Sequence, residues 1–481
     1  MMLRRSVWWV LLSLAALVAF ADEVDDLVAR AVKQYQAGNV TQAIETLEGA
    51  RQKSPNHKGT LQWLGFLYLR VGRAADAVPV LEQLVQLAPN DAQAHNNLGN
   101  AYLHTGQPDK ALAEYRTVLK LKPDFADAHY NMANILMKQG KMNEAIVAFQ
   151  TAARLAPQDP YIWNNLGVAL MGANRLKEAI EAYRKAAALE PKNAQVWTNL
   201  GLALHAAGNL REAEAAFMKA LAIDARSLGA VLGLAQTYAS QKQDAKAIQL
   251  FQRAVAMQPD SFVAHYNLGV LYARANNSAE AEKALRRALE LQPNHRDTLL
   301  ALASLYQKDK RLLEAENTYR ALVEAYPKDA EGWWQLGAVL VLQNKNEEAV
   351  QAWEKLLVLS PQHLKGRIAL ANLLYRLNRD SEAEEHYKLV LKQDARNVEA
   401  LNGLGLVCDR QGRLQEAETY LKQAIAINPN YAYAHNNLGV VYEKMGKKNE
   451  AIECYRRALS INPNYTDARN NLQRFTRTTT P

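Results

Sequence analysis

Apolar and polar positions recur with a period of 34 residues along almost the whole chain. In each period, positions 4, 7, 8 and 11 are apolar or small, as in Trp163, Leu166, Gly167 and Leu170. This spacing forms one face of a helix. Positions 20, 24 and 27 form a second such face, as in Ala179, Tyr183 and Ala186. The pattern therefore predicts two helices in every period.

Thirteen periods, counted from Val24–His57, follow one another without insertion or deletion and end at Tyr465. Position 20 is Ala in all thirteen, and position 8 is always Gly or Ala, so the two helices can approach closely beside a large residue at position 24. Position 15 is Gly, Asn or Lys, which predicts a left-handed residue at the end of the first helix, strained at Lys242 and Lys310. Position 32 is Pro in eleven periods and ends the second helix.

The W-x2-LG-x2-Y pattern of the first helix, the Ala and aromatic residue of the second, and the closing Pro resemble the tetratricopeptide repeat. Residues Tyr161–Asn193 and Ala432–Tyr465 match this pattern well. The resemblance implies an all-α fold, a right-handed α-solenoid superhelix of antiparallel helix pairs, with thirteen repeats at residues 24–465. Residues 466–481 are expected to form a capping helix followed by a disordered tail, Thr478–Pro481.

The N-terminus departs from the repeat pattern. Arg4 and Arg5 precede an apolar run, Val7–Phe20, and Ala19 and Ala21 are small residues of the kind that signal peptidase requires. We expect residues 1–21 to be a secretory signal peptide cleaved before Asp22. The alternative, an uncleaved anchor, is disfavoured because the run is short for a bilayer span. The chain is thus expected to be exported by the general secretory route, and to be periplasmic or extracellular.

The charge, the cysteine content and the motifs of the chain limit the classes of function that it could have. The 57 basic and 49 acidic residues are interspersed along the 481 residues, so this modest excess does not favour a nucleic-acid partner. No later apolar run could span a membrane. Cys408 and Cys454 are expected to be small buried residues rather than a disulfide. No P-loop, GxSxG, HExxH, CxxC or GxGxxG motif occurs, so the sequence predicts neither an enzyme nor a cofactor.

Four histidines lie at position 4, on the buried stripe: His95, His129, His265 and His435. They suggest either a ladder for metal binding or acid–base chemistry, or flat side chains that replace an aromatic residue in the core. Successive position-4 residues lie on separate helices, too far apart to share one metal ion. Packing is therefore the favoured interpretation, and no metal site is predicted.

Positions 2, 6, 9 and 13 point away from the buried stripe, with position 5 at its flank. The resemblance implies that first helices line a concave groove. Position 6 carries asparagine at Asn97, Asn131, Asn165, Asn199, Asn267, Asn437 and Asn471, and the row is broken at Gly233, Ala301, Ala369 and Gly403. It resembles the asparagine ladder in the repeat half of O-linked N-acetylglucosamine transferases, which holds an extended peptide by its backbone. Bridging of neighbouring helices is the alternative, and no transferase domain is present.

Two further sets of residues face the expected groove. A basic stripe at position 13 comprises Arg70, Lys138, Arg274, Lys308, Arg376, Arg410 and Lys444. It would suit acidic peptides or anionic polysaccharide, but acids at position 2 make matching of the helix dipole the favoured explanation. The aromatic residues on this side are Tyr130, Tyr161, Tyr266, Trp334 and Tyr433, which act either as binding anchors or as packing between first helices.

These features favour a non-catalytic scaffold of the cell envelope that binds extended peptide segments or partner proteins in its groove. Two alternatives remain open. The chain could be an accessory protein of an envelope system for polysaccharide synthesis or export, or it could present substrates to a separate enzyme. Peptide binding would depend on the asparagines, whereas saccharide binding would depend on the aromatic residues and the basic stripe.

Overall fold

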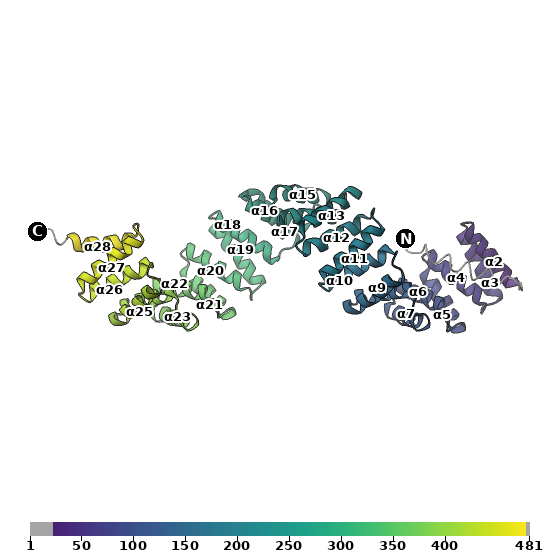
Figure 1. Ribbon diagram of the computed structural model, residues 1–481, viewed down its shortest axis with the longest axis horizontal. Coiled ribbons are helices and arrows are strands. Elements are labelled where there is room, and N and C mark those ends of the chain that lie inside the picture. The colour runs from purple at the N-terminus through teal and green to yellow at the C-terminus, as the bar shows by residue number, and fades with distance from the viewer. Residues whose placement is uncertain (1–22, 478–481) are drawn as a thin grey trace. The chain divides into compact units, whose positions relative to one another are not determined.

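The computed structural model describes residues 23–477, and every regular element in that range is an α-helix (Figure 1). The expected signal peptide, residues 1–21, and the tail Thr478–Pro481 lie outside the described residues. The predicted all-α fold is confirmed, with twenty-seven helices and no strand between residues 23 and 477. No helix among them combines the length and apolar character that a membrane crossing requires.

First and second helices alternate along the chain. The first helices are α2 (Glu23–Gln36), α4 (Lys58–Arg70), α6 (Ala92–His104), α8 (Ala126–Lys138), α10 (Pro160–Gly172), α12 (Ala194–Ala206), α14 (Leu228–Ser240), α16 (Phe262–Arg274), α18 (Arg296–Lys308), α20 (Ala330–Leu342), α22 (Leu364–Arg376), α24 (Val398–Arg410), α26 (Ala432–Lys444) and α28 (Thr466–Arg477). The second helices are α3 (Val40–Lys53), α5 (Ala74–Leu87), α7 (Pro108–Leu121), α9 (Met142–Leu155), α11 (Leu176–Leu189), α13 (Leu210–Ile223), α15 (Asp244–Met257), α17 (Ser278–Leu291), α19 (Leu312–Ala325), α21 (Asn346–Leu359), α23 (Asp380–Gln393), α25 (Leu414–Ile427) and α27 (Lys448–Ile461).

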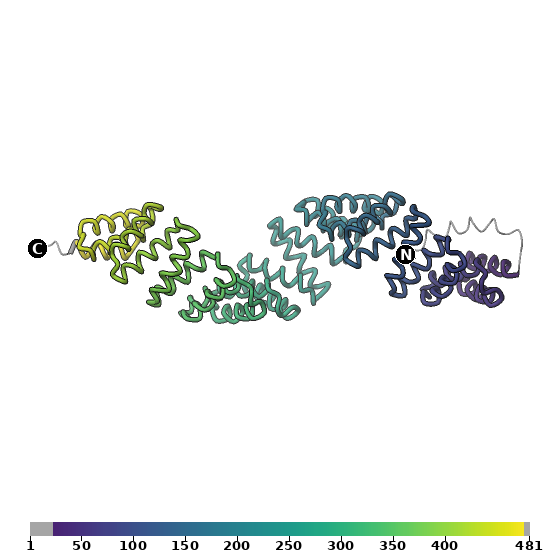
Figure 2. The backbone as a smooth tube through the Cα atoms, turned by 90° about the horizontal axis from the view of Figure 1, so that it is seen from below, coloured from purple at the N-terminus to yellow at the C-terminus, as the bar shows by residue number. Residues whose placement is uncertain are grey.

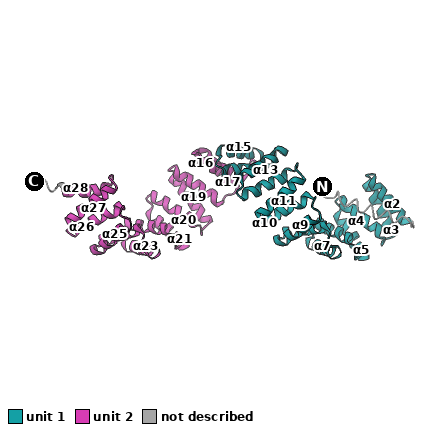
Figure 3. Ribbon diagram, in the orientation of Figure 1, with its two compact units in different colours: residues 1–257 teal, residues 258–481 magenta. Residues whose placement is uncertain are grey.

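The chain divides into two compact units, residues 1–257 and 258–481 (Figure 3). We call them unit 1 and unit 2. In each unit every first helix except α28, which ends the series, packs on the second helix that follows it, and the resulting pairs stack on their neighbours as a solenoid (Figure 2). Each repeat thus buries its apolar faces against the adjoining repeats. The 34-residue register continues through the boundary in the sequence.

The small residues at positions 8 and 20 bring the paired helices together, as predicted. A Cβ atom built on Gly439 in α26 would lie 2.6 Å from Cε1 of Tyr455 in α27, which is closer than any stable contact. Tyr455 is at position 24 and is fully buried, as are the position-20 alanines. Because glycine has no side chain there, the ring lies directly against the backbone of the first helix.

The first helices end in the left-handed conformation that position 15 predicts. Seven glycines and four asparagines at this position have positive φ, and so do Lys242 (φ 60°) and Lys310 (φ 59°). A lysine in this region strains the backbone because its Cβ approaches a carbonyl oxygen. The two strained turns were therefore predicted correctly.

Position 34 provides the N-terminal cap of the next first helix. Its side chain accepts a hydrogen bond from a backbone N–H in the first turn at ten sites: His57, Asp91, Asp159, Asn193, Ser227, Ser261, His295, Asp329, His363 and Asn397. Such caps satisfy N–H groups that have no partner within the helix. Phe125 and Tyr431 occupy the same position and make no side-chain cap.

The position-4 histidines pack into the repeats, as expected, and also make a specific hydrogen bond. Trp163, Trp197 and Trp333 each donate from Nε1 to a proline carbonyl oxygen six residues earlier, at 2.9 Å. In the four histidines, Nε2 lies 2.9–3.0 Å from the equivalent carbonyl oxygen. Histidine therefore replaces tryptophan because both are flat rings with an N–H donor on the same side.

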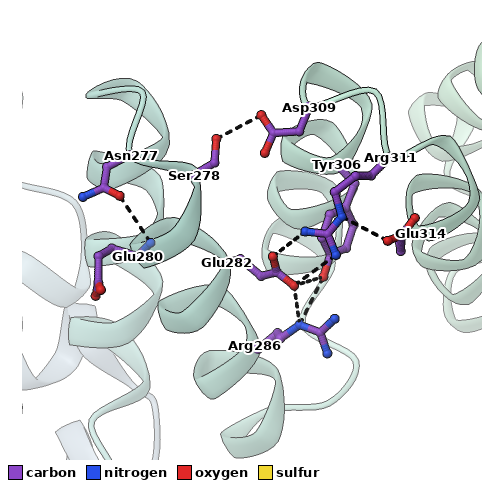
Figure 4. Close-up of polar contacts among 9 residues, drawn as sticks. All are labelled: Asn277, Ser278, Glu280, Glu282, Arg286, Tyr306, Asp309, Arg311 and Glu314. Atoms are coloured by element: carbon purple, nitrogen blue, oxygen red, sulfur yellow. Dashed lines mark hydrogen bonds and ion pairs between the residues drawn. The ribbon is translucent and has the colours of Figure 1, made fainter.

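In unit 2, adjacent repeats are joined by ion pairs between position 21 and position 16 of the next repeat. The carboxylate of Glu282 on α17 lies 2.5 Å from Nη1 of Arg311, at the start of α19 (Figure 4). It also accepts hydrogen bonds from Tyr306 and Arg286. The equivalent pairs are Glu316–Lys345, Glu384–Arg413 and Glu418–Lys447.

Both cysteines have free thiols, Cys408 buried and Cys454 partly buried. The expectation of a small buried residue is confirmed for Cys408, whereas Cys454 lies only at the margin of the core; burial raises the pKa of the Cys454 thiol to about 11. A thiol with a raised pKa is a weak nucleophile at neutral pH.

Candidate functional site: the exposed face of the first helices

Three of the four position-6 asparagines of unit 1 join neighbouring first helices. Asn131 donates from Nδ2 to Oδ1 of Asn100 in the preceding repeat, at 3.0 Å. Asn165 likewise donates to Asn134 at 3.1 Å and to the Tyr130 hydroxyl at 2.9 Å. Asn199 donates to Oδ1 of Asn164 at 2.9 Å. Asn97, on the preceding first helix, only accepts a hydrogen bond from Gln93 on its own helix. We call the four position-6 residues of consecutive repeats the amide row: Asn97, Asn131, Asn165 and Asn199.

A second series runs through the last helices of unit 2. Asn471 on α28 donates to Oδ1 of Asn436, whose own Nδ2 reaches Oδ1 of Asn437. Asn437 in turn donates to Asn402 on α24 at 2.9 Å. Adjacent asparagines at positions 5 and 6 thus pass hydrogen bonds from one repeat to the next. Asn267 is separate, since its Nδ2 donates to the Val263 carbonyl oxygen on its own helix.

Bridging of neighbouring helices, the alternative raised from the sequence, therefore occurs in both series. It uses only part of each amide, which has two N–H donors and two acceptor lone pairs. Asn199 accepts from Gln195 and donates to Asn164, so one donor and one lone pair remain. Asn131, Asn165 and Asn199 are partly exposed, whereas Asn97 is only 8% exposed.

The basic stripe is only partly available to a ligand. Lys308 donates to Oδ1 of Asn276, and Lys444 pairs with Asp409 at 2.7 Å. Arg410 pairs with Asp380 at 2.9 Å and lies 3.5 Å above the Tyr375 ring. All of these partners belong to the preceding repeat. The side chains of the remaining stripe residues are exposed at the ends of their helices: Arg70, Lys138, Arg274 and Arg376.

The aromatic residues at position 5 pack within their own repeats. Tyr130 lies against Phe149 with ring centroids 5.8 Å apart, and its hydroxyl accepts the bond from Asn165. Trp334 stacks on Trp353 at 5.6 Å, and Tyr266 stacks on Phe262 at 6.0 Å. At these three sites the side chain packs within its own repeat and not, as the packing alternative supposed, between successive first helices.

The tyrosines at position 2 are exposed. Tyr161 on α10 is 41% exposed and Tyr433 on α26 is 52% exposed. Tyr433 also belongs to a group of three rings, since its centroid lies 5.6 Å from that of Tyr431 and 5.1 Å from that of Tyr465. We call Tyr431, Tyr433 and Tyr465 the tyrosine cluster. Tyr431 and Tyr465 were not singled out from the sequence, although aromatic residues at position 34, where Phe125 also stands, are a departure from its usual capping residues.

Burial and neighbouring carboxylates raise the pKa values of two tyrosines in the tyrosine cluster. Burial raises the pKa of Tyr465 to about 12, and the charge of Asp467 contributes to this shift. Burial also raises the pKa of Tyr431, with a contribution from Glu399. Both hydroxyls are therefore neutral at physiological pH. Among the described residues, no group of three or more His, Cys, Asp or Glu side chains is arranged to hold a metal ion.

Comparison with known sequences identifies repeats in several parts of the chain. Models of the tetratricopeptide repeat match residues 34–101, 198–262 and 432–465. The tetratricopeptide domain of cytochrome c-type biogenesis protein H matches residues 318–431. The C-terminal domain and the middle tetratricopeptide-like domain of cilia and flagella-associated protein 70 match residues 80–226 and 231–357. No curated protein matches this sequence.

Several solved structures are similar to the chain. The APC/C hetero-tetramer Cut9–Hcn1 is 14% identical, with 97% of this chain and 98% of that chain covered and a TM-score of 0.37. PilF of Pseudomonas aeruginosa is 20% identical over 44% of this chain and 97% of its own, with a TM-score of 0.39. YrrB, described as a tetratricopeptide protein with an unusual peptide-binding site, is 23% identical over 40% and 98%, with a TM-score of 0.35. The matched repeats and the observed helix pairs together identify the chain as a tetratricopeptide repeat protein.

Proposed function

We propose that this protein is a non-catalytic scaffold that binds extended peptide segments of partner proteins along the amide row of unit 1. A tetratricopeptide scaffold is consistent with protein–protein interaction. The observation that supports this particular site is the presence of partly exposed amides on consecutive first helices, each held in place by bonds to its neighbour.

Amide spacing and orientation both suit an extended peptide. Packed helices lie about 8–10 Å apart, and an extended chain advances about 3.3 Å per residue, so roughly every third peptide group would meet an asparagine. Because internal hydrogen bonds already orient these amides, little side-chain freedom would be lost on binding. An amide donates to a carbonyl and accepts from an N–H, so it recognises peptide groups regardless of their side chains.

Two matched substitutions separate ligand binding from bridging. Asn199→Ala removes the 2.9 Å bond to Asn164, and Asn437→Ala removes the 2.9 Å bond to Asn402. Both variants should lose a similar free energy of unfolding, about 1–2 kcal/mol, because each leaves a neighbouring amide without its donor. Only Asn199→Ala should weaken binding of peptides selected from a random library against the full chain.

Equal affinity of the two variants for the selected peptides would show that the amide row serves only to bridge repeats. Titration with anionic oligosaccharides tests the polysaccharide alternative, and saturable binding that is lost in Arg70→Ala or Lys138→Ala would favour it. If peptides bind and oligosaccharides do not, a peptide-binding scaffold is supported.

We also propose that the chain acts outside the cytoplasm, on the basis of the apolar N-terminal run described above. Expression with its own N-terminus, followed by mass spectrometry of the purified protein, should give a chain that begins at Asp22. Recovery of the uncleaved chain in the membrane fraction would instead favour an anchor, and recovery in the cytoplasm would contradict export.

A further inference from the structure

Tyr433 is exposed, and the repeats before and after it carry a carboxylate at the equivalent position. Position 2 is Glu399 on α24, Tyr433 on α26 and Asp467 on α28. These three first helices pack side by side in unit 2, so each carboxylate is about one interhelical distance, roughly 8–10 Å, from the tyrosine. Neither Glu399 nor Asp467 forms an ion pair with any of the described residues, and Glu399 is exposed.

The other two rings of the tyrosine cluster both contact the ring of Tyr433. Tyr431 meets it at an interplanar angle of 58° and Tyr465 at 66°. The turns that carry them have neutral residues at position 33, Asn430 and Asn464. On α28, the guanidinium of Arg469 is directed to the Pro463 carbonyl oxygen, at 2.6 Å.

Two members of the tyrosine cluster, Tyr431 and Tyr465, occupy the position where helix capping would favour other residues. Position 34 usually provides the side chain that caps the next first helix, but Tyr431 makes no such cap for α26. Tyr465 stands at the same position before α28, and its hydroxyl is too far from its own backbone to cap the helix. Departures from a local rule are expected where function requires a particular side chain.

An aromatic face with unpaired carboxylates beside it is complementary to a cationic side chain. The electron-rich face of a tyrosine attracts an ammonium or guanidinium group, and nearby carboxylates add to this attraction. We propose that the tyrosine cluster, with Glu399 and Asp467, binds an arginine or lysine side chain of a partner protein's extended segment. This inference rests on the proposed peptide-binding function. It adds that unit 2 prefers peptide segments that carry a basic side chain.

The test compares two labelled peptides that differ only in charge. One contains arginine at alternate positions among glycines, and in the other every arginine is replaced by citrulline, which has the same shape and no charge. The full chain should bind the arginine peptide about tenfold more tightly at low salt, and the difference should shrink as the salt concentration rises.

Substitutions of single tyrosines test whether the arginine peptide binds at the tyrosine cluster. Tyr433→Ala should weaken binding of the arginine peptide about tenfold and so remove its advantage over the citrulline peptide, whereas Tyr161→Ala should leave the ratio of the two affinities unchanged. Tyr161 is the matched control because it is exposed at the same position of another repeat and has no aromatic neighbour at position 34. Glu399→Gln should weaken binding of the arginine peptide severalfold and leave that of the citrulline peptide unaltered.

A third variant excludes loss of folding as the explanation. Tyr431→Asn introduces the residue that caps α12 and α24 at this position, so the new cap should offset part of the packing that the partly buried Tyr431 ring loses, and the decrease in melting temperature should be small. Its affinity for the arginine peptide should nevertheless decrease, because one ring of the tyrosine cluster is lost. A variant with unchanged stability and full affinity would overturn the proposal.

The outcome also separates this inference from the proposed function. If the arginine and citrulline peptides bind equally well and Asn199→Ala weakens both, the peptide-binding scaffold is retained and the cation site is rejected. If neither peptide binds and selected library peptides do not bind either, both proposals fail.

Discussion

At the residue scale, each position of the repeat requires a physical property rather than a particular amino acid. Position 4 accepts tryptophan or histidine because each can donate a ring N–H to the same proline carbonyl oxygen. Position 8 requires a small residue because an aromatic or leucine side chain at position 24 lies against the backbone there. The repeated hexapeptide AHNNLG, at 94–99 and 434–439, combines these requirements with two amides, which bridge neighbouring repeats in the second copy only.

A strained turn gives a prediction at the same scale. Lys310→Gly should stabilise the protein by about 1 kcal/mol, because glycine adopts the observed φ of 59° without a steric penalty. Thermal and urea unfolding would measure the change. Lys308→Gly, two residues earlier at the end of α18, is the control and should destabilise the protein by about 1 kcal/mol. Destabilisation by Lys310→Gly would show that the lysine side chain makes a compensating contact.

At the element scale, the limits of the first helices depend on position 34 at the start and position 15 at the end. The helix pairs themselves could be predicted from the sequence, because the spacing of apolar residues is a local property of the chain. The caps were not identified from the sequence, since histidine is an unusual capping residue and conceals the pattern. His57, His295 and His363 nevertheless accept a backbone hydrogen bond through Nδ1.

The caps give the prediction at this scale. Asp91→Ala should destabilise unit 1 by about 1 kcal/mol, because Oδ1 of Asp91 accepts hydrogen bonds from the N–H groups of Gln93 and Ala94. The same substitution should increase the rate of amide hydrogen exchange in the first turn of α6. Asp124→Ala, an exposed acid in a neighbouring turn, should have an effect within about 0.5 kcal/mol. Similar losses for the two variants would indicate a general charge effect instead of a cap.

At the scale of the whole molecule, the two units use different side chains to join their repeats. Position 21 is aliphatic in six of the seven repeats that begin in unit 1: Ile44, Val78, Leu112, Ile146, Ile180 and Ile248. Four of the six repeats of unit 2 have glutamate there: Glu282, Glu316, Glu384 and Glu418. The partner Arg311 lowers the pKa of Glu282, and Lys422 lowers that of Glu418. In Glu316 and Glu384 burial acts to raise the pKa, but the neighbouring cations have the larger combined effect and the pKa is lowered.

This difference predicts that acid will destabilise unit 2 before unit 1. A carboxylate whose pKa is lower in the folded chain contributes stability above its unfolded pKa, and that contribution is lost as the pH falls from about 4.5 through the folded pKa. Hydrogen exchange with mass spectrometry on the full chain should show α17–α25 losing protection first. Glu316→Gln should reduce this pH dependence, whereas uniform loss of protection across both units would contradict the prediction.

The sequence by itself determined the helix pairs and the place of every turn, because the 34-residue period repeats these local and nearest-neighbour relationships thirteen times. Only the tertiary structure decided what the exposed residues contact. Asn131 reaches position 9 of the preceding repeat while Asn199 reaches position 5, since the choice depends on which neighbouring side chain is polar and within hydrogen-bonding distance. The tyrosine cluster likewise could be recognised only in the structure, where residues of successive repeats lie side by side. The spacing of repeats along the sequence does not give the distances between their side chains in space.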